Sequence, residues 1–223
     1  MRRILAPLLL GLIGCAILLS LCVWQVIRLS QKQAYLAQIE ADMQGTPAPL
    51  PTAPDPSMKY APVWVEGMTT GEEILILSGM KDMGGGYQVI SAFQSDDGRR
   101  ILIDRGFIVQ DARKTPRPPV RLRLAGNLHW PDEVNASTPA PNLTENIWFA
   151  REVARMAAHL KTEPVLIVLA EAEGDLQGIT PLPLTTAGIP NNHLQYAVTW
   201  FLLAVVWAGM TIGLIWRIRQ RQF

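Results

Sequence analysis

The sequence predicts a membrane protein of the α+β class: two transmembrane helices, one N-terminal and one C-terminal, flank a mostly antiparallel β outer domain with one packed helix. The apolar residues concentrate in two blocks, residues 4–27 and 194–216. Each block is long enough to cross a hydrocarbon core of about 30 Å, since a helix rises about 1.5 Å per residue. Between the blocks, strand-like segments alternate with turn residues, which is typical of antiparallel sheet.

The first apolar block has two alternative interpretations, a cleaved signal and a lipoprotein anchor. Leu12-Ile13-Gly14-Cys15 resembles a bacterial lipoprotein processing site. However, residues 16–23 stay apolar, where a lipoprotein would turn polar, so a transmembrane helix is favoured. Both cysteines lie in this block. The outer domain therefore has neither a disulfide framework nor a thiol nucleophile.

The distribution of Lys and Arg predicts the orientation in the membrane. Five basic residues flank the outer ends of the two blocks, and two flank the inner end of the first; they are Arg2, Arg3, Arg217, Arg219 and Arg221, and Arg28 and Lys32. We therefore expect both termini in the cytoplasm and the central domain in the periplasm. No mitochondrial presequence precedes the first block, so a bacterial inner (plasma) membrane is the simplest compartment.

The central segment is mildly acidic. It holds all 19 acidic residues and 15 of the 20 basic residues, a net charge of −4. This charge excludes a nucleic-acid partner and leaves the lipid bilayer as the expected non-protein surface.

Residues 28–59 are predicted to continue the first helix and then form a linker. Leu29, Leu36, Ile39 and Met43 recur at roughly helical spacing. Five prolines between residues 47 and 56 then predict an extended connection, because proline and the residue before it avoid the α region.

Residues 60–189 form the predicted periplasmic domain. Segments 63–68 and 73–78 suggest a hairpin around Thr69-Thr70-Gly71-Glu72. Asp96-Asp97-Gly98 predicts a tight turn between strands at 87–93 and 100–109. A half-solvated strand is expected at 120–128, a helix at 148–160 and a buried strand at 164–170.

The outer domain shows no pattern of a known enzyme class. It has no Cys nucleophile, no H-x-x-x-H or H-E-x-x-H spacing and no G-x-S-x-G elbow. Gly84-Gly85-Gly86 precedes a strand, not a helix N-terminus, so a flexible hairpin loop is favoured over a phosphate cradle. An envelope enzyme would require two of its carboxylates, such as Asp104 and Asp132, to meet in one cleft with raised pKa values.

The second apolar block begins with a capping cluster, Pro190-Asn191-Asn192-His193. His193 is either a polar residue at the membrane interface or, as a neutral imidazole, a metal or haem ligand. At 100° per residue, His193, Tyr196, Trp200 and Trp207 share one face.

The opposite face of the second block carries Gly209 and Gly213, a G-x-x-x-G pattern that allows close helix approach. We expect this glycine face to pack on the first helix near Gly11, Gly14 and Cys15. The face of His193 would then be turned to lipid, a partner helix or a flat macrocycle. An interfacial aromatic belt explains Tyr196 and Trp200 but not Trp207, near mid-bilayer.

Polar residues of the two helices are expected at the same depth, at the outer boundary of the bilayer. Trp24, Gln25 and Arg28 stand level with residues 191–193. A haem ligated by His193 would place its propionates near water, where Arg28 could pair with one.

These segments resemble the Surfeit locus protein 1 family of assembly factors for haem–copper cytochrome oxidases. The resemblance is carried by the C-terminal signature at residues 190–201, by Trp24-Gln25 with Arg28 and Lys32, by Gly86-Tyr87-Gln88-Val89 and by Leu102-Ile103-Asp104-Arg105-Gly106-Phe107. Asp104 and Phe107 replace the usual Asn and Trp, and Cys22 stands where a Gly precedes the Trp-Gln pair. The two terminal helices around an outer domain match the family over the whole chain.

The resemblance implies a protein that is not an enzyme and that matures the large subunit of cytochrome c oxidase. It implies transient haem a binding, with His193 as the iron ligand. Tyr196 and Trp200, which share its face, and Arg28 and Trp24, which stand at its level, would then line the site. The partners would be the oxidase large subunit and haem a synthase. A pure interaction protein that stabilises an assembly intermediate without haem is the alternative, with His193 then capping the helix or bonding across to the first helix.

Overall fold

The structure is a computed structural model that describes the backbone of residues 2–220 and the side chains of residues 4–220. Two compact units make up the chain: one contains the two long helices, and the other, residues 39–185, contains the sheet. Three basic residues used for the orientation, Arg2, Arg3 and Arg221, have side chains outside the described residues.

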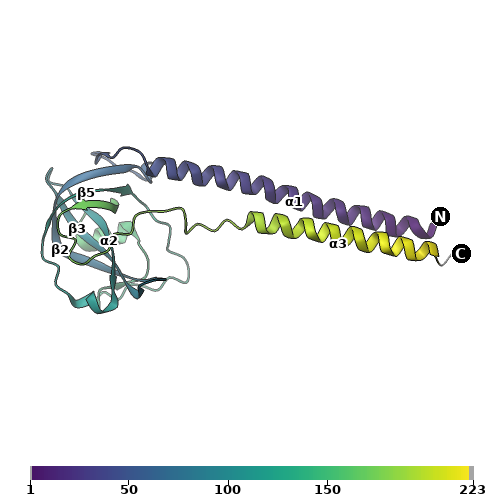
Figure 1. The fold of residues 1–223 in the computed structure, drawn as a ribbon. Coiled ribbons are helices and arrows are strands. Elements are labelled where there is room, and N and C mark those ends of the chain that lie inside the picture. Colours follow the sequence, from purple (N-terminus) through teal and green to yellow (C-terminus); the bar gives the residue numbers. More distant parts are fainter. Residues whose placement is uncertain (1, 221–223) are drawn as a thin grey trace. The chain divides into compact units, whose positions relative to one another are not determined.

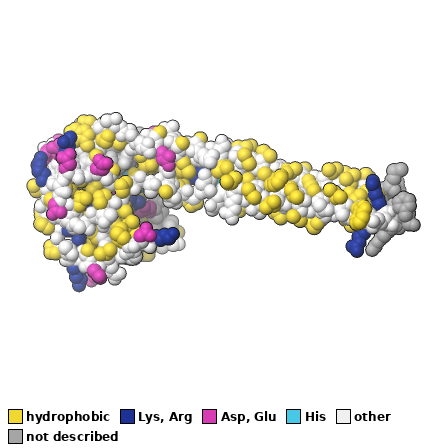
Figure 2. All heavy atoms as spheres, in the orientation of Figure 1, with side chains coloured by type: hydrophobic (Ala, Val, Ile, Leu, Met, Phe, Trp, Pro, Cys, Tyr) yellow, Lys and Arg dark blue, Asp and Glu magenta, His cyan; other side chains and the backbone are white. Residues whose placement is uncertain are grey.

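The helical unit consists of α1 (Arg2–Met43) and α3 (His193–Gln220), which run antiparallel (Figure 1). Their most apolar stretches have mean hydropathies of 2.6 and 2.1, and only 6% of each stretch is buried. Hydrophobic side chains cover the outside of both helices (Figure 2), as expected where lipid is the solvent. The 42 residues of α1 extend about 63 Å, so the predicted continuation through residue 43 is confirmed.

The outer domain is built on one seven-stranded, mostly antiparallel sheet (Figure 1). Its main strands are β2 (Pro62–Met80), β3 (Gly84–Ser95), β4 (Arg100–Val109), β5 (Arg121–Leu128) and β7 (Leu166–Glu173). They pair in the order β2-β3-β4-β7-β5, and β5 pairs back onto β2, so the sheet closes on itself. Only β4–β7 among these pairs is parallel.

Short elements complete the domain. Strands β1 (Ala48–Pro49) and β6 (Ile147–Trp148) both lie parallel to β2. Two 3₁₀ turns, η1 (Pro56–Met58) and η2 (Gln110–Lys114), precede β2 and follow β4, and helix α2 (Val153–Leu160) precedes β7. The predicted fold class, two terminal helices around a β-rich domain with one packed helix, is confirmed.

The hairpin predicted around residues 69–72 is wrong. The two segments form a single strand, β2, with a bulge between Thr69 and Glu73. Gly71 has φ +81°, which a glycine adopts without strain, and this conformation bends the strand without reversing it. The bend lets the first half of β2 pair with β5 and the second half with β3.

The other predicted elements of the domain are found close to their expected positions. β3 and β4 form the predicted hairpin, whose turn carries Gly98 at φ +90°. β5 and β7 are the strands expected at 120–128 and 164–170, while α2 starts five residues later than expected because Ile147 and Trp148 pair with β2. Gly84-Gly85-Gly86 pairs with residues 78–80 as part of β3, so it forms a strand and not a loop.

The two faces of β4 bury different cores because side chains alternate along a strand. Ile101 and Ile103 pack with Phe93, Leu122 and Leu124 on one face of the closed sheet. Leu102 points the opposite way and packs with residues of α2 such as Met156. Helix α2 is therefore held by its apolar stripe, as its predicted helical spacing implied.

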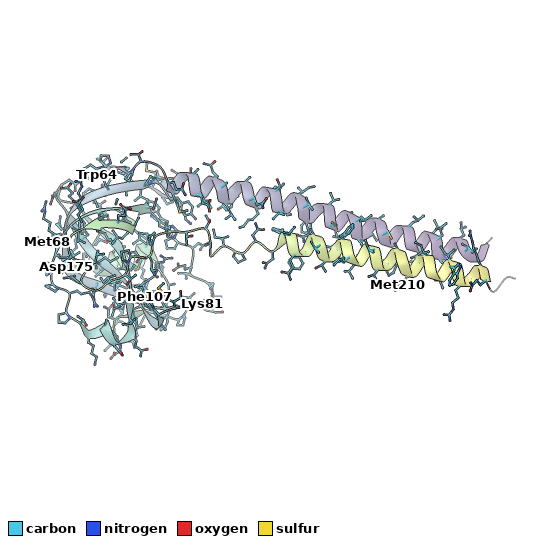
Figure 3. All side chains as sticks on the ribbon, in the orientation of Figure 1. Trp64, Met68, Lys81, Phe107, Asp175 and Met210 are labelled. Atoms are coloured by element: carbon cyan, nitrogen blue, oxygen red, sulfur yellow. The ribbon has the colours of Figure 1, made fainter. Side chains whose placement is uncertain are left out.

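The segment Arg105-Gly106-Phe107 anchors the chain that follows β7. Phe107 exchanges two backbone hydrogen bonds with Thr180, of 2.8 and 2.9 Å. Gly106 has φ +115°, and a Cβ there would lie 2.1 Å from the Thr180 carbonyl oxygen, so only glycine fits. The buried Arg105 donates to Leu176 O and to Gln177 Oε1. This motif thus has a structural explanation within the domain (Phe107 is labelled in Figure 3).

Candidate functional site

The helical unit packs through small residues of α1. A Cβ added to Gly11 would lie 2.2 Å from the Thr211 side chain, and one added to Gly14 would lie 2.2 Å from the Trp207 indole. The Cys15 thiol donates to the Ala204 carbonyl oxygen at 3.9 Å. Close helix approach therefore depends on α1 glycines that accept large side chains of α3.

The prediction that Gly209 and Gly213 pack on α1 is wrong. Nothing lies within 4 Å of a Cβ added at either position, and the neighbouring Met210 is 58% exposed (Figure 3). The face of His193 and Trp207 is instead the one that meets α1. The glycines of α1 leave space for larger side chains of α3, and the Trp207 ring fills the space beside Gly14. A glycine of α3 has no side chain that could fill this space.

Both helices present their less exposed residues at alternating intervals of three and four. The less exposed residues of α3 include His193, Ala197, Trp200, Ala204, Trp207 and Thr211; those of α1 include Ile4, Pro7, Gly11, Gly14, Leu18, Leu21 and Gln25. This spacing is the heptad pattern of two helices in side-by-side contact. It places His193 and Gln25 in the last layer of the α1–α3 pair.

His193 and Gln25 make the polar contact of that layer. His193 Nδ1 lies 2.8 Å from Gln25 Oε1, and Gln25 is only 8% exposed. Because an amide oxygen only accepts hydrogen bonds, a hydrogen bond between these two atoms requires the tautomer that carries the proton on Nδ1. The contact confirms that the residues around Gln25 and His193 stand level. Nε2 makes no hydrogen bond to any residue between 4 and 220.

A hollow of about 340 Å³ opens beside His193. It is lined by Arg28, Gln31, Lys32, Tyr35 and His193. Arg28 forms no ion pair within the described residues and donates to Gln31 Oε1 at 3.2 Å. Lys32 likewise has no ion pair there. The hollow therefore joins one imidazole to two unpaired cations.

The remaining predicted site residues lie at different distances from this hollow. Trp24 is 49% exposed and its ring lies under the Arg28 guanidinium, 5.8 Å from ring centroid to Cζ. Tyr196 is 54% exposed and does not line the hollow. Trp200 lies two turns along α3 from His193, and its buried Nε1 has no partner in the described part of the chain. Sequence reasoning missed Gln31 and Tyr35, which have no distinctive spacing.

The outer domain contains a second cluster of ionisable groups, around Arg151. Arg151 donates to the buried Asp104 at 3.0 Å and to Glu133. Burial raises the pKa of Asp104 to about 6 against the attraction of Arg151. Burial also acts on Glu133, but its hydrogen bonds and charge attraction to Arg151 are stronger and lower its pKa.

The Arg151 cluster does not meet the condition for an acid–base enzyme. Only one of its carboxyl groups has a raised pKa, and Arg151 stands between the two. His129 is buried with Nδ1 unpartnered, and burial together with the charges of Arg151 and Lys59 lowers its pKa to about 4. Among residues 4–220, no three His, Cys, Asp or Glu side chains are grouped to hold a metal ion.

Comparison with known proteins places these features in a family. The SURF1 family model matches residues 12–205. A SURF1-like protein of Monosiga brevicollis is 32% identical over 212 residues, covering 86% of this chain and 80% of that protein. A SURF1-like protein of Rickettsia felis is 29% identical, covering 87% and 90%, and Surfeit locus protein 1 of Rattus norvegicus is 28% identical, covering 80% and 65%. The chain therefore belongs to the SURF1 family.

Proposed function

We propose that this protein is a membrane-anchored assembly factor for haem–copper cytochrome c oxidase, which holds haem a transiently and passes it to the large subunit or stabilises that subunit during insertion. Family membership supports the assembly role. The observation that carries the haem role is the contact between His193 and Gln25, which leaves Nε2 free beside a hollow with two unpaired cations.

The residues present fit a haem in the chemistry of their donors. A haem supplies an iron that accepts an imidazole nitrogen, and two carboxylates. His193 would hold the iron through Nε2, because Nδ1 is occupied. Arg28 and Lys32 would bind the carboxylates, and neither has to leave an ion pair within residues 4–220 to do so.

The position of this hollow at the end of the α1–α3 pair suits a carrier that must release its cargo. Tyr196 and Trp24 are about half exposed and offer aromatic surface to a macrocycle or to a partner helix. Trp200 has an indole donor that the described residues leave free. In the proposed orientation both termini are cytoplasmic and the sheet domain is periplasmic, so the hollow lies at the periplasmic boundary of the inner membrane.

A second candidate function is a scaffold that binds the oxidase assembly intermediate without haem, and the same contact between His193 and Gln25 favours it. The hydrogen bond between His193 and Gln25 satisfies both side chains across the helices. Such a contact contributes modestly to the pairing of membrane helices and needs no ligand.

Haem content distinguishes the two functions. The full chain is purified from cells that make haem a, as wild type, His193→Ala and His159→Ala; His159 is an exposed histidine of α2 and serves as the matched control. We expect His193→Ala to lower the haem a content at least tenfold and His159→Ala to leave it unchanged.

Equal haem in wild type and His193→Ala would exclude His193 as the ligand. Absence of a Soret band in the intact protein, with the oxidase large subunit still co-purifying, would establish the scaffold function. Arg28→Gln tests the carboxylate contact. Its loss is expected to weaken haem retention about 10- to 150-fold, because a charge-assisted hydrogen bond contributes about 1.5–3 kcal/mol.

A further inference from the structure

We infer that Gln25 is a positioning residue for His193: its amide oxygen keeps the imidazole proton on Nδ1 and thereby presents Nε2 as the nitrogen that binds an electrophilic metal centre. The location of the proton can be tested on the protein alone. Its consequence for a bound metal centre rests on the proposed function.

The atoms in contact decide where the proton is. Gln25 Oε1 lies 2.8 Å from His193 Nδ1. Since an amide oxygen has no hydrogen to give, the ring nitrogen must be the donor. The opposite arrangement, with the amide nitrogen facing the ring, would make Nδ1 an acceptor and move the proton of a neutral ring to Nε2, which then could not bind a metal.

The surroundings restrict Gln25 to this partner. Its side chain is 8% exposed, and α1 carries it in the heptad row that faces α3. Ala197, four residues after His193 in α3, is buried and offers no side-chain donor. An amide or imidazole left unpaired in such apolar surroundings is costly, so the two groups stay together.

Gln31, which lines the hollow, provides a comparison with Gln25. It lies six residues further along α1, and its Oε1 accepts from Arg28 Nη1 at 3.2 Å. Gln31 is exposed, whereas Gln25 is buried. The two glutamines therefore have different tasks: Gln31 contacts the cation, and Gln25 fixes the imidazole.

The chemical consequence concerns the strength of the ligand. A metal-binding imidazole that donates its other N–H to an acceptor is held in one tautomer and orientation and becomes more basic. Loss of such an acceptor typically lowers metal affinity 10- to 100-fold. A neutral amide gives a moderate effect, while a carboxylate at the same place would increase the electron donation to the metal.

The first experiment locates the proton. The full chain is labelled with ¹⁵N and ¹³C in its three histidines, and His193 is assigned by the signal that His193→Ala removes. We expect the neutral Nδ1–H form for His193 in the wild type and in Gln31→Leu, and a shift toward Nε2–H in Gln25→Leu. An Nε2–H form in the wild type, or an unchanged signal in Gln25→Leu, overturns the inference.

The second experiment measures the consequence with haem a as the probe. Gln25→Leu is expected to lower haem a affinity 10- to 100-fold, and Gln25→Glu to restore binding with a lower reduction potential of the bound iron. Gln33→Leu is the control, because Gln33 is an exposed glutamine of α1 that does not line the hollow, and it should leave the affinity unchanged. Unchanged affinity and potential in all three variants would contradict a positioning role.

The two experiments separate the inference from the function on which it rests. If the wild type binds no haem a but shows the Nδ1–H form that Gln25→Leu loses, the proposed haem function fails and the assignment of Gln25 stands. If haem a binds through His193 with the same affinity and potential in Gln25→Leu, the inference fails and the proposed function stands.

Discussion

A polar contact of the outer domain and one of the helical unit differ in how far their hydrogen-bonding capacity is used. In the domain, Arg117 is 2% exposed as a side chain and is held by Glu73 through both Nε and Nη2. In the helical unit, His193 contacts Gln25 through Nδ1, while its Nε2 has no partner among residues 4–220. His129 of the domain also has a nitrogen without a partner in the described residues, but it is buried, whereas His193 lines a hollow. The Arg117 contact therefore supports the fold, and His193 has a nitrogen that a ligand can reach.

The same contrast separates the cations of the two units. Most arginines of the domain lie in ion pairs, such as Arg99 with Glu163 and Arg151 with Asp104, while the buried Arg105 of β4 donates to Leu176 O and to Gln177 Oε1. Arg28 and Lys32 have no acidic neighbour among the described residues. This difference directs the search for a functional site away from the domain, although the domain contains nearly all the charge.

The largest effect is expected from breaking the buried ion pair of the domain. Glu73→Gln would leave the Arg117 guanidinium buried without a counter-charge, which typically costs about 3–5 kcal/mol. Glu66→Gln is the matched control, because Glu66 and Arg123 form an exposed pair whose loss costs at most about 1 kcal/mol. Thermal unfolding of the full chain in detergent measures both, and equal losses would show that burial does not distinguish the two pairs.

A smaller, pH-dependent effect is expected at Asp104. Its pKa of about 6 in the folded protein exceeds the unfolded value of 3.8. The folded state therefore binds this proton more tightly, and stability is lost as the pH rises through about 6. The loss amounts to about 3 kcal/mol at neutral pH, since one pKa unit corresponds to about 1.4 kcal/mol.

Asp104→Asn should remove that loss. The variant is expected to be more stable than the wild type at pH 7.5 and to become equal to it only below about pH 3.8, where Asp104 is protonated in both the folded and the unfolded state. His129 acts in the opposite direction: its folded pKa of about 4 lies below 6.5, so its contribution is lost as the pH falls. Amide hydrogen exchange in β4, from below about pH 3.8 up to pH 7.5, measures the balance. A variant less stable at pH 7.5 would show that the ion pair with Arg151 outweighs burial.

Local patterns in the sequence predicted the elements whose partners are close in the chain. The hairpin of β3 and β4 follows from Asp96-Asp97-Gly98, and the two long helices follow from apolar runs. Pairings between distant segments were not predictable. The parallel contact of β4 with β7 joins residues more than 60 positions apart. The prediction of two strands in place of β2 was wrong because Gly71 is equally compatible with a turn and with a bulge.

The candidate site was predicted in part for the same reason. The capping position and the family resemblance indicated His193. The equal depth of Gln25 and His193 in the bilayer indicated that the two residues lie side by side. The packing face of α3 was predicted wrongly because helical geometry alone offers two faces, one with glycines and one with aromatics. The choice depends on Gly11 and Gly14 of the other helix, which accept Thr211 and Trp207.

The smallest effect is expected from removing the polar layer itself. Hydrogen bonds between membrane helices contribute about 0.6 kcal/mol on average, so His193→Ala should change the pairing of α1 and α3 less than threefold. Oxidative cross-linking between Cys15 and Ala204→Cys, in a Cys22→Ser background, reports the pairing because the Cys15 thiol contacts Ala204. Gly14→Leu is the positive control, since its side chain would overlap Trp207 and should abolish the cross-link.

If His193→Ala reduced cross-linking as strongly as Gly14→Leu, the layer would be structural, and the contrast between the two units would no longer identify a site. A cross-link that survives His193→Ala while haem a is lost would assign the histidine to the ligand and the glycines to the fold.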